Sequence, residues 1–158
     1  MMLRVGGCRR RGKTVGWFDD AEVQRVKQEK ERIDAERRLR EQQKKTEHAE
    51  LMDFTVRGLT AFPSAARKAG LPTEKREIGR VGLRPKTVDG WLLMTSVFDN
   101  SYLYHYWVDV DGGVWTDTTP SDVQRMAQWL AKSCDYRSDA IRETLTAALA
   151  GVPLTKAY

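Results

Sequence analysis

Residues 91–116 constrain the fold of this chain more than any other segment. Their sequence is WLLMTSVFDNSYLYHYWVDVDGGVWT, in which two dense apolar and aromatic runs meet at Asp99-Asn100 and a third short run follows Asp111-Gly112-Gly113. Asx and Gly residues at these junctions supply the positive φ angles of tight hairpin turns. Aromatic and β-branched residues suit a pleated, half-buried surface. The segment therefore predicts a three-stranded antiparallel meander as the nucleus of a small α+β domain.

A two-residue turn at Asp99-Asn100 would also set the register of the first hairpin. On one face it pairs Val97 with Tyr102, Thr95 with Tyr104, Leu93 with Tyr106 and Trp91 with Val108. On the other face it pairs Ser96 with Leu103, Met94 with His105 and Leu92 with Trp107. Both faces are rich in apolar groups, so both need cover. Helices from the C-terminal part of the chain are the candidates for that cover.

A long helix is predicted over residues 20–50, which contain no Gly or Pro and are rich in helix-forming residues. Asp19 fits the N-cap and Glu22 fits N3, while Phe18 can pack onto Val23 as a hydrophobic staple. Favourable ion pairs one turn apart are expected along it, namely Asp34–Arg38, Glu36–Arg40 and Glu41–Lys45. The cap and the ion pairs are therefore predicted to hold this helix.

The apolar residues of this helix are too sparse for a core. They are Val23, Val26, Ile33 and Leu39. The heptad that would continue from Val26 and Ile33 meets Arg40, so the pattern favours a solvated helix, with a coiled coil as the alternative. We expect these four residues to anchor a partner protein or a weak self-association.

The character of the chain changes near Leu51. Apolar residues then recur at helical spacing, which predicts that the helix enters the domain with an apolar face formed by Leu51, Phe54 or Thr55, Leu59 and Phe62. Pro63 is expected to end or kink this helix, and a short helix over residues 63–69 is expected to stop at Gly70. Residues 73–90 leave a short helix and an edge strand open as alternatives.

Two further helices are predicted after the meander. Thr119 and Pro120 fit the N-cap and N1 positions of the first, and Ser138 can cap the second. The predicted fold class is α+β: a long charged N-terminal helix, then a small antiparallel sheet of three strands, or four, packed by two C-terminal helices. The expected divisions are a disordered basic tail over residues 1–17, the helix over residues 18–62 and a compact domain over residues 63–158.

The formal net charge of +5 is unevenly distributed. Residues 1–13 hold five basic groups and no acid, and residues 51–90 hold eight basic and four acidic groups. Such asymmetry suits a polyanionic partner. No apolar run reaches the ~18 residues of a membrane span, and the N-terminus lacks the apolar segment of a secretory signal. With Cys8 and Cys134 far apart, no disulfide framework or metal knuckle is predicted, and a cytoplasmic location is expected.

Residues 7–14, Gly-Cys-Arg-Arg-Arg-Gly-Lys-Thr, match the phosphate-loop pattern letter for letter. They resemble the Walker A loop of the P-loop NTPase family, in which a buried strand leads into the loop and a helix begins at the Lys-Thr pair. Here six residues precede the pattern, Gly16 follows it, and the next helix begins afresh at Asp19. No series of strands alternates with helices to build a parallel sheet. A basic tail is the favoured interpretation, and P-loop nucleotide binding is the third-ranked one.

Residues 64–71 fit the first helix and turn of a helix-turn-helix motif, because small residues are followed by Gly70 and Leu71. A recognition helix would then occupy residues 73–78, although Gly79, Gly82 and Pro85 would curtail it. The candidate nucleic-acid-binding residues are Arg9, Arg10, Arg11, Lys13, Arg67, Lys68, Lys75 and Arg76.

The remaining candidates for chemistry have structural explanations. The tyrosine row at Tyr102, Tyr104 and Tyr106 could stack bases, but no Lys or Arg lies between Trp91 and Asp122, so core packing is predicted. His105 is expected to be a half-buried sheet residue, and the aspartates around Gly112-Gly113 fit hairpin chemistry. No catalytic residue, metal ligand or cofactor is predicted.

The leading hypothesis is therefore a non-enzymatic protein-interaction or adaptor protein. Its partner surface would lie on the helix over residues 20–50, and its partner would be another protein or a second copy of the chain. The alternative is a nucleic-acid-associated protein that uses the basic tail and the basic segment 67–86. No membrane association is expected.

Overall fold

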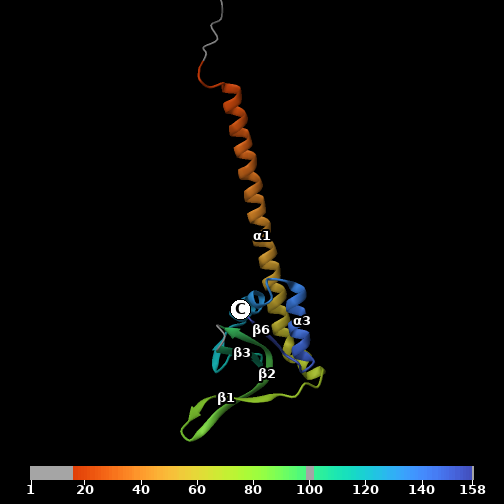
Figure 1. The fold of residues 1–158 in the computed structure, drawn as a ribbon. Helices are drawn as coiled ribbons and strands as arrows, with labels where there is room; N and C mark the ends of the chain where they lie inside the picture. Colours follow the sequence, from red (N-terminus) through yellow and green to blue (C-terminus); the bar gives the residue numbers. More distant parts are fainter. Residues whose placement is uncertain (1–15, 99–101, 158) are drawn as a thin grey trace, which may run out of the picture. The chain divides into compact units, whose positions relative to one another are not determined.

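The computed structural model describes residues 16–98 and 102–157, and the chain divides into two compact units, residues 1–43 and 44–158. Its elements are α1 (Asp20–Lys68), β1 (Glu74–Val81), β2 (Arg84–Phe98), β3 (Tyr102–Asp109), β4 (Val114–Thr116), β5 (Thr119–Ser121), α2 (Val123–Ser133), α3 (Ser138–Leu149) and β6 (Leu154–Ala157) (Figure 1). The predicted α+β class is confirmed. The predictions for the basic tail, the phosphate-loop pattern and the turn at Asp99-Asn100 lie outside the described residues.

Among the residues that the structure describes, the sheet has six strands, more than the three or four expected from the sequence. Strands β1 to β5 follow one another in chain order and pair antiparallel, while β6 pairs parallel with β2. Residues 74–81, for which a short helix had remained open, form β1. The short strands β5 and β6 gave no sequence signal, because three or four residues hold too few side chains to show a period of two.

The register of the β2–β3 hairpin changes at a β-bulge between Leu92 and Met94. Below the bulge, Trp91 faces Val108 and Leu92 faces Trp107, as predicted. Beyond it, the observed pairs are shifted by one residue from the prediction: Met94 with Tyr106, Thr95 with His105, Ser96 with Tyr104 and Val97 with Leu103. The extra residue at the bulge keeps Trp91 and Met94 on the same face of the sheet.

Helix α1 begins where its capping signal predicted. The carboxylate of Asp19 accepts a hydrogen bond from the backbone N–H of Ala21 at 3.0 Å, and the Asp19 carbonyl accepts one from Val23 at 2.9 Å. Both are N-cap contacts. The predicted cap is therefore confirmed.

The far end of α1 differs from the prediction, because the helix continues through Pro63 to Lys68. Burial of Leu59, Phe62 and Ala66 on both sides of the proline stabilises the helix enough to offset the missing N–H. The helix ends in a Schellman motif. Leu71 N–H bonds to the Ala66 carbonyl and Gly70 N–H to the Arg67 carbonyl, with Gly70 at φ +66°.

The core of the second unit lies between one face of the sheet and the three helical segments of that unit. Phe62 of α1 meets the ring of Trp91 at 6.3 Å, edge to face, and Trp129 of α2 meets Tyr106 at 5.8 Å. The buried apolar residues of α2 are Met126, Ala127, Leu130 and Ala131, and those of α3 include Ala140, Ile141 and Ala148. The predicted helices therefore cover one face of the sheet rather than both.

The caps of these two helices differ from the prediction. Asp122, rather than Thr119, is the N-cap of α2, and its carboxylate accepts from Arg125 N–H at 2.8 Å. Thr119 belongs to β5 instead. Arg137 is the N-cap residue of α3 without a side-chain hydrogen bond, and Ser138 is already helical.

On the other face of the sheet, Trp107 is fully buried by its neighbours. The ring of Trp115 stacks on it at 5.1 Å, and the guanidinium of Arg76 lies 5.6 Å from the ring centroid. Gly90 allows this packing, because a Cβ there would lie 2.8 Å from the Trp107 ring and 2.4 Å from the Val108 carbonyl oxygen. An aromatic side chain and a cation thus supply cover on this face.

Candidate functional site

The first unit contains residues 20–43 of α1, and their side chains are exposed except for a partly exposed Asp34. Large apolar side chains are exposed here too: Trp17 at 97%, Phe18 at 81%, Val26 at 64% and Ile33 at 50%. A globular protein gains stability by burying such groups, so a cluster of them in contact with water indicates a surface for a partner. We call Trp17, Phe18, Val23, Val26 and Ile33 the exposed helix face.

Helix geometry decides which of the predicted partner-binding residues belong to this face. At about 100° of rotation per residue, Val23, Val26 and Ile33 fall within an arc of about 80°. Leu39 falls more than about 100° away from Val26 and Ile33 by the same geometry, on another side of the helix. The structure therefore groups three of the four predicted residues and separates Leu39 from them.

Trp17 and Phe18 extend the face beyond the first helical turn. With Val23 and Val26, these two aromatic residues line a hollow of about 320 Å³ at the start of α1, whose other lining residues are Asp19, Glu22 and Lys27. From the sequence, Phe18 was predicted only as part of a hydrophobic staple, and Trp17 was not among the predicted site residues. Two adjacent aromatic residues before an N-cap were the signal that could have added them.

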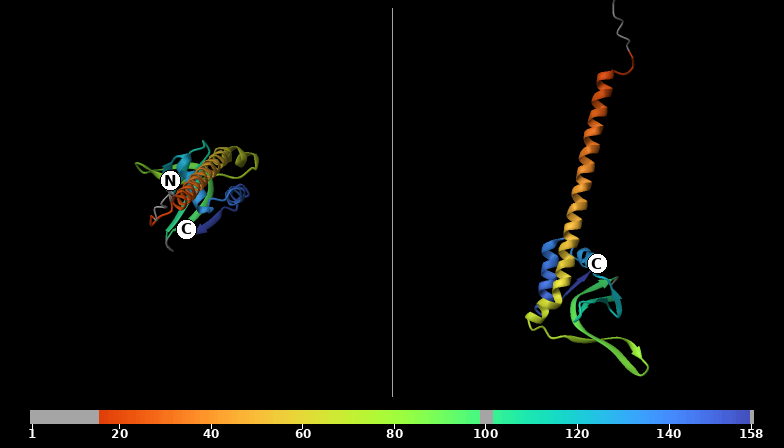
Figure 2. Two further views of the ribbon diagram at one scale, coloured as in Figure 1. Left: turned by 90° about the horizontal axis from the view of Figure 1, so that it is seen from above. Right: turned by 180° about the vertical axis from the view of Figure 1, so that it is seen from behind.

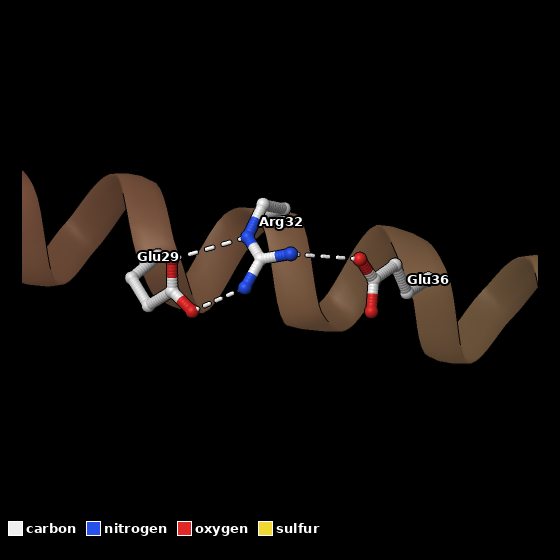
Figure 3. A network of polar contacts seen from close by, with 3 residues as sticks. All are labelled: Glu29, Arg32 and Glu36. Atoms are coloured by element: carbon white, nitrogen blue, oxygen red, sulfur yellow. Dashed lines mark hydrogen bonds and ion pairs between the residues drawn. The ribbon is translucent and has the colours of Figure 1, made fainter.

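Ion pairs between neighbouring turns flank the exposed helix face. Arg32 bridges Glu29 at 2.5 Å and Glu36 at 2.9 Å (Figure 3). Farther along the helix, Arg37 contacts Glu41 at 3.3 Å. Glu36 and Glu41 thus pair with arginines one turn before them, whereas the sequence predicted Arg40 and Lys45 one turn after them. The hydrogen bond and positive charge of Arg32 lower the pKa of Glu29, and Glu29 raises that of Arg32.

Two of the predicted nucleic-acid-binding residues contact the core of the second unit. Arg67 donates to the Val110 carbonyl oxygen, and its guanidinium lies 6.0 Å from the Trp91 ring centroid. Arg76 lies over Trp107 and pairs with Glu74 at 3.6 Å. Lys68 and Lys75 are exposed. The recognition helix expected over residues 73–78 is wrong, because strand β1 occupies that segment.

A different basic surface lies on the hairpin of β1 and the first part of β2. This hairpin runs out from the rest of the sheet in both views of the second unit (Figure 2). Its tip carries Arg80, Arg84 and Lys86. The basic segment 67–86 was predicted from the sequence, but Arg84 and Lys86 were not among the predicted site residues, because the pattern of residues 73–90 fits a strand and a short helix equally.

The tyrosine row lines a cleft of about 630 Å³ beside α2. Tyr106 is buried, as the core-packing prediction requires, but Tyr104 is half-buried and Tyr102 is exposed. Trp129 and Lys132 of α2 join the cleft, as do Asp117 and three threonines. No cation near this row was predicted from the sequence, because Lys132 lies on α2 and reaches the cleft only through the packing of that helix.

The acidic residues of the sheet and its turns, and the histidine of β3, form hydrogen bonds with neighbouring residues of the same sheet. The Asp109 carboxylate accepts hydrogen bonds from Asp111 N–H, Gly113 N–H and the Trp115 indole at 2.8–2.9 Å. Asp117 accepts from the His105 backbone N–H at 3.0 Å, and the His105 ring contacts Thr95 Oγ1 at 3.1 Å. Within residues 16–98 and 102–157, His, Cys, Asp and Glu side chains form no group of three suited to a metal ion.

Comparisons with protein-family models, with curated proteins and with solved structures found no match to this chain. In the part of the chain that the structure describes, no helix combines the length and apolar character that crossing a membrane requires.

Proposed function

We propose that this chain is a non-enzymatic interaction protein that binds a partner protein through the exposed helix face. The observation that carries this proposal is the set of large apolar side chains exposed at the start of α1. Trp17 and Phe18 lie just before the helix, Val26 and Ile33 lie on it, and each of the four is at least half exposed. Residues 20–43 contribute no member of the buried core. A helical segment such as this one, which buries no side chain and yet carries large apolar groups, fits a binding element better than a structural one.

The partner that suits this face is a folded protein with an apolar groove. Helix-in-groove recognition uses apolar anchors on one side of an amphipathic helix, and the ion-paired side chains along the flank would form its solvated rim. A long coiled coil of two copies fits less well. Lys30 and Arg37 stand four residues after Val26 and Ile33, where a continuous seam needs apolar groups.

Site-specific photo-crosslinking in cells that naturally produce the protein tests this proposal. A crosslinking residue at position 26 should capture a discrete partner, and the same residue at position 39, on another side of the helix, should not. The double variant Val26→Asp with Ile33→Asp should abolish the crosslink from position 23, while Leu39→Asp should preserve it. Equal capture from positions 26 and 39 would contradict a defined face.

Crosslinks between two copies of the chain would show that the exposed helix face mediates self-association rather than binding to another protein. Sedimentation of the purified chain at several concentrations separates these cases, because self-association gives a mass that rises with concentration. The non-enzymatic assignment and a cytoplasmic location belong to the same proposal. The buried free thiol of Cys134 is compatible with the reducing conditions of that compartment.

A further inference from the structure

Strand β1 pairs with residues 84–90 of β2 in a hairpin, residues 74–90, which we call the ribbon arm. The end of this arm contributes no residue to the buried core. Every residue from 79 to 87 is exposed, on both faces and on both strands. A two-stranded hairpin without cover is marginally stable in water. An arm of this kind therefore adds little to the stability of the fold, and a bound partner would give it a role.

The end of the ribbon arm is cationic. Residues 78–88 contain Arg80, Arg84 and Lys86 and no acidic residue. Arg80 contacts Glu77 at 3.3 Å, whereas Arg84 and Lys86 form no ion pair within the described residues. Because residues opposed across two strands share a face, the pairs Val81–Arg84 and Gly79–Lys86 set both free cations on one face of the arm.

The root and the tip of the arm have distinct roles. At the root, Arg76 packs on Trp107 and pairs with Glu74, which ties the arm to the core. At the tip, Gly82 has φ +66°, the conformation needed at the first central position of a II′ hairpin turn. This turn presents Leu83, which is fully exposed, between Val81 and Arg84.

We propose that the ribbon arm binds double-stranded DNA. The major groove of B-form DNA admits a two-stranded β-ribbon, and the unpaired cations of the arm would contact phosphates along its edges. The apolar tip suits contact with base edges or insertion at a base step. The deep, narrow major groove of duplex RNA does not admit such a ribbon, so the proposal is specific to DNA.

Fluorescence anisotropy with a labelled DNA duplex, at several salt concentrations, tests the arm in the full chain. The double variant Arg84→Ala with Lys86→Ala should weaken binding by about tenfold and reduce the slope of log affinity against log salt by about two. Lys44→Ala with Lys45→Ala removes the same charge from exposed positions of α1 and should change neither quantity by a comparable amount. Leu83→Ser should weaken binding and leave the salt slope unchanged.

The basic residues at positions 9–11 and 13 can also attract DNA, so the ribbon variants are repeated in a chain with Ala at these four positions. The loss caused by Arg84→Ala with Lys86→Ala should persist there. Equal affinity and slope for the ribbon and Lys44/Lys45 variants would overturn the proposal. Vesicles of phosphatidylcholine with phosphatidylserine provide a second test. If the chain bound these vesicles but not DNA, and if Arg84→Ala with Lys86→Ala abolished that binding, the proposal would be overturned, because the arm would then recognise an anionic membrane. Val26→Asp with Ile33→Asp should bind DNA like the unmodified chain, which keeps this test separate from that of the helix face.

Discussion

The two halves of helix α1 share a secondary structure but differ in what holds it. Residues 20–43 are stabilised by the Asp19 cap and by ion pairs between neighbouring turns. Residues 44–68 belong to the second unit and bury Thr55, Leu59, Phe62, Pro63 and Ala66. The second half even keeps a proline in its interior, at a position where local propensity alone would end a helix.

This difference shows that helix propensity and tertiary burial can each sustain a helix without the other. Local interactions contribute a few tenths of a kcal/mol per ion pair and roughly 1 kcal/mol per cap, whereas a buried large side chain contributes about 1.5–3 kcal/mol. Substitutions in the first half should therefore have small, local effects, and those in the second half large, global ones.

The largest expected effect is that of Phe62→Ala. Phe62 is 1% exposed and packs edge to face on Trp91, so its truncation should cost about 3–5 kcal/mol of unfolding free energy. Ile33→Ala in the first half should cost under about 0.5 kcal/mol. Urea unfolding followed by tryptophan fluorescence measures both. Similar losses of unfolding free energy in the two variants would show that the first half of α1 is packed as tightly as the second.

An intermediate effect is expected for Gly58→Val. A Cβ at Gly58 would lie 2.8 Å from Leu145 Cδ1 of α3, so a branched side chain must displace that leucine. We expect a loss of about 1–3 kcal/mol in the same urea experiment. Ala35→Val is the matched change on an exposed turn and should cost about 0.5 kcal/mol or less. An unchanged unfolding free energy for Gly58→Val would mean that Leu145 shifts to accept the larger side chain at little cost.

A smaller and local effect is expected for Asp19→Ala. Loss of the N-cap should destabilise the first turn of α1 by about 1 kcal/mol and leave the unfolding of the second unit unchanged. Amide hydrogen exchange should accelerate at residues 21–23 and not at residues 55–66. Asp20→Ala is the control, because Asp20 lies within the helix. Faster exchange throughout α1 would indicate that the two halves open together.

The smallest effect concerns the pH dependence of the ion pair drawn in Figure 3. Arg32 lowers the pKa of Glu29 by its hydrogen bond and charge. The stabilisation is therefore present above the ordinary glutamate pKa and is lost as the pH falls through the lowered value. An NMR titration of the Glu29 carboxyl should show this lowered pKa, and Arg32→Gln should return it to the ordinary value. An unchanged Glu29 titration in that variant would exclude the pair in solution.

Local signals in the sequence predicted the parts of the fold that depend on neighbouring residues. The cap at Asp19, the onset of burial near Leu51 and the stop at Gly70 were all correct. Each depends on hydrogen bonds or side-chain spacing within a few residues. Features that depend on distant pairing were missed. The bulge after Leu92 shifts the register, and the exposed first part of β2 lacks the apolar alternation by which a strand is recognised.

The candidate surfaces likewise divide into features set by neighbouring residues and features set by tertiary contacts. Helical spacing alone groups Val23, Val26 and Ile33 on one side of α1 and sets Leu39 on another, and the role of these residues in binding stays a prediction. Tertiary contacts decided the rest. Arg67 and Arg76 are as basic in sequence as Arg84 and Lys86, yet the first two lie over tryptophan rings and the last two are exposed on the ribbon arm. Only the packing of Trp91 and Trp107 distinguishes these pairs.

The parallel pairing of β6 with β2 determines when the sheet can be completed during synthesis on the ribosome. The edge of β2 at residues 94–97 emerges well before residues 154–157, which pair with it. Until then the nascent chain carries a strand edge with unpaired N–H and C=O groups beside a dense apolar run. Such an edge can pair with another nascent chain. The yield of correctly folded protein should therefore depend on the delay between translation of β2 and of β6, and pauses in the intervening codons should increase aggregation.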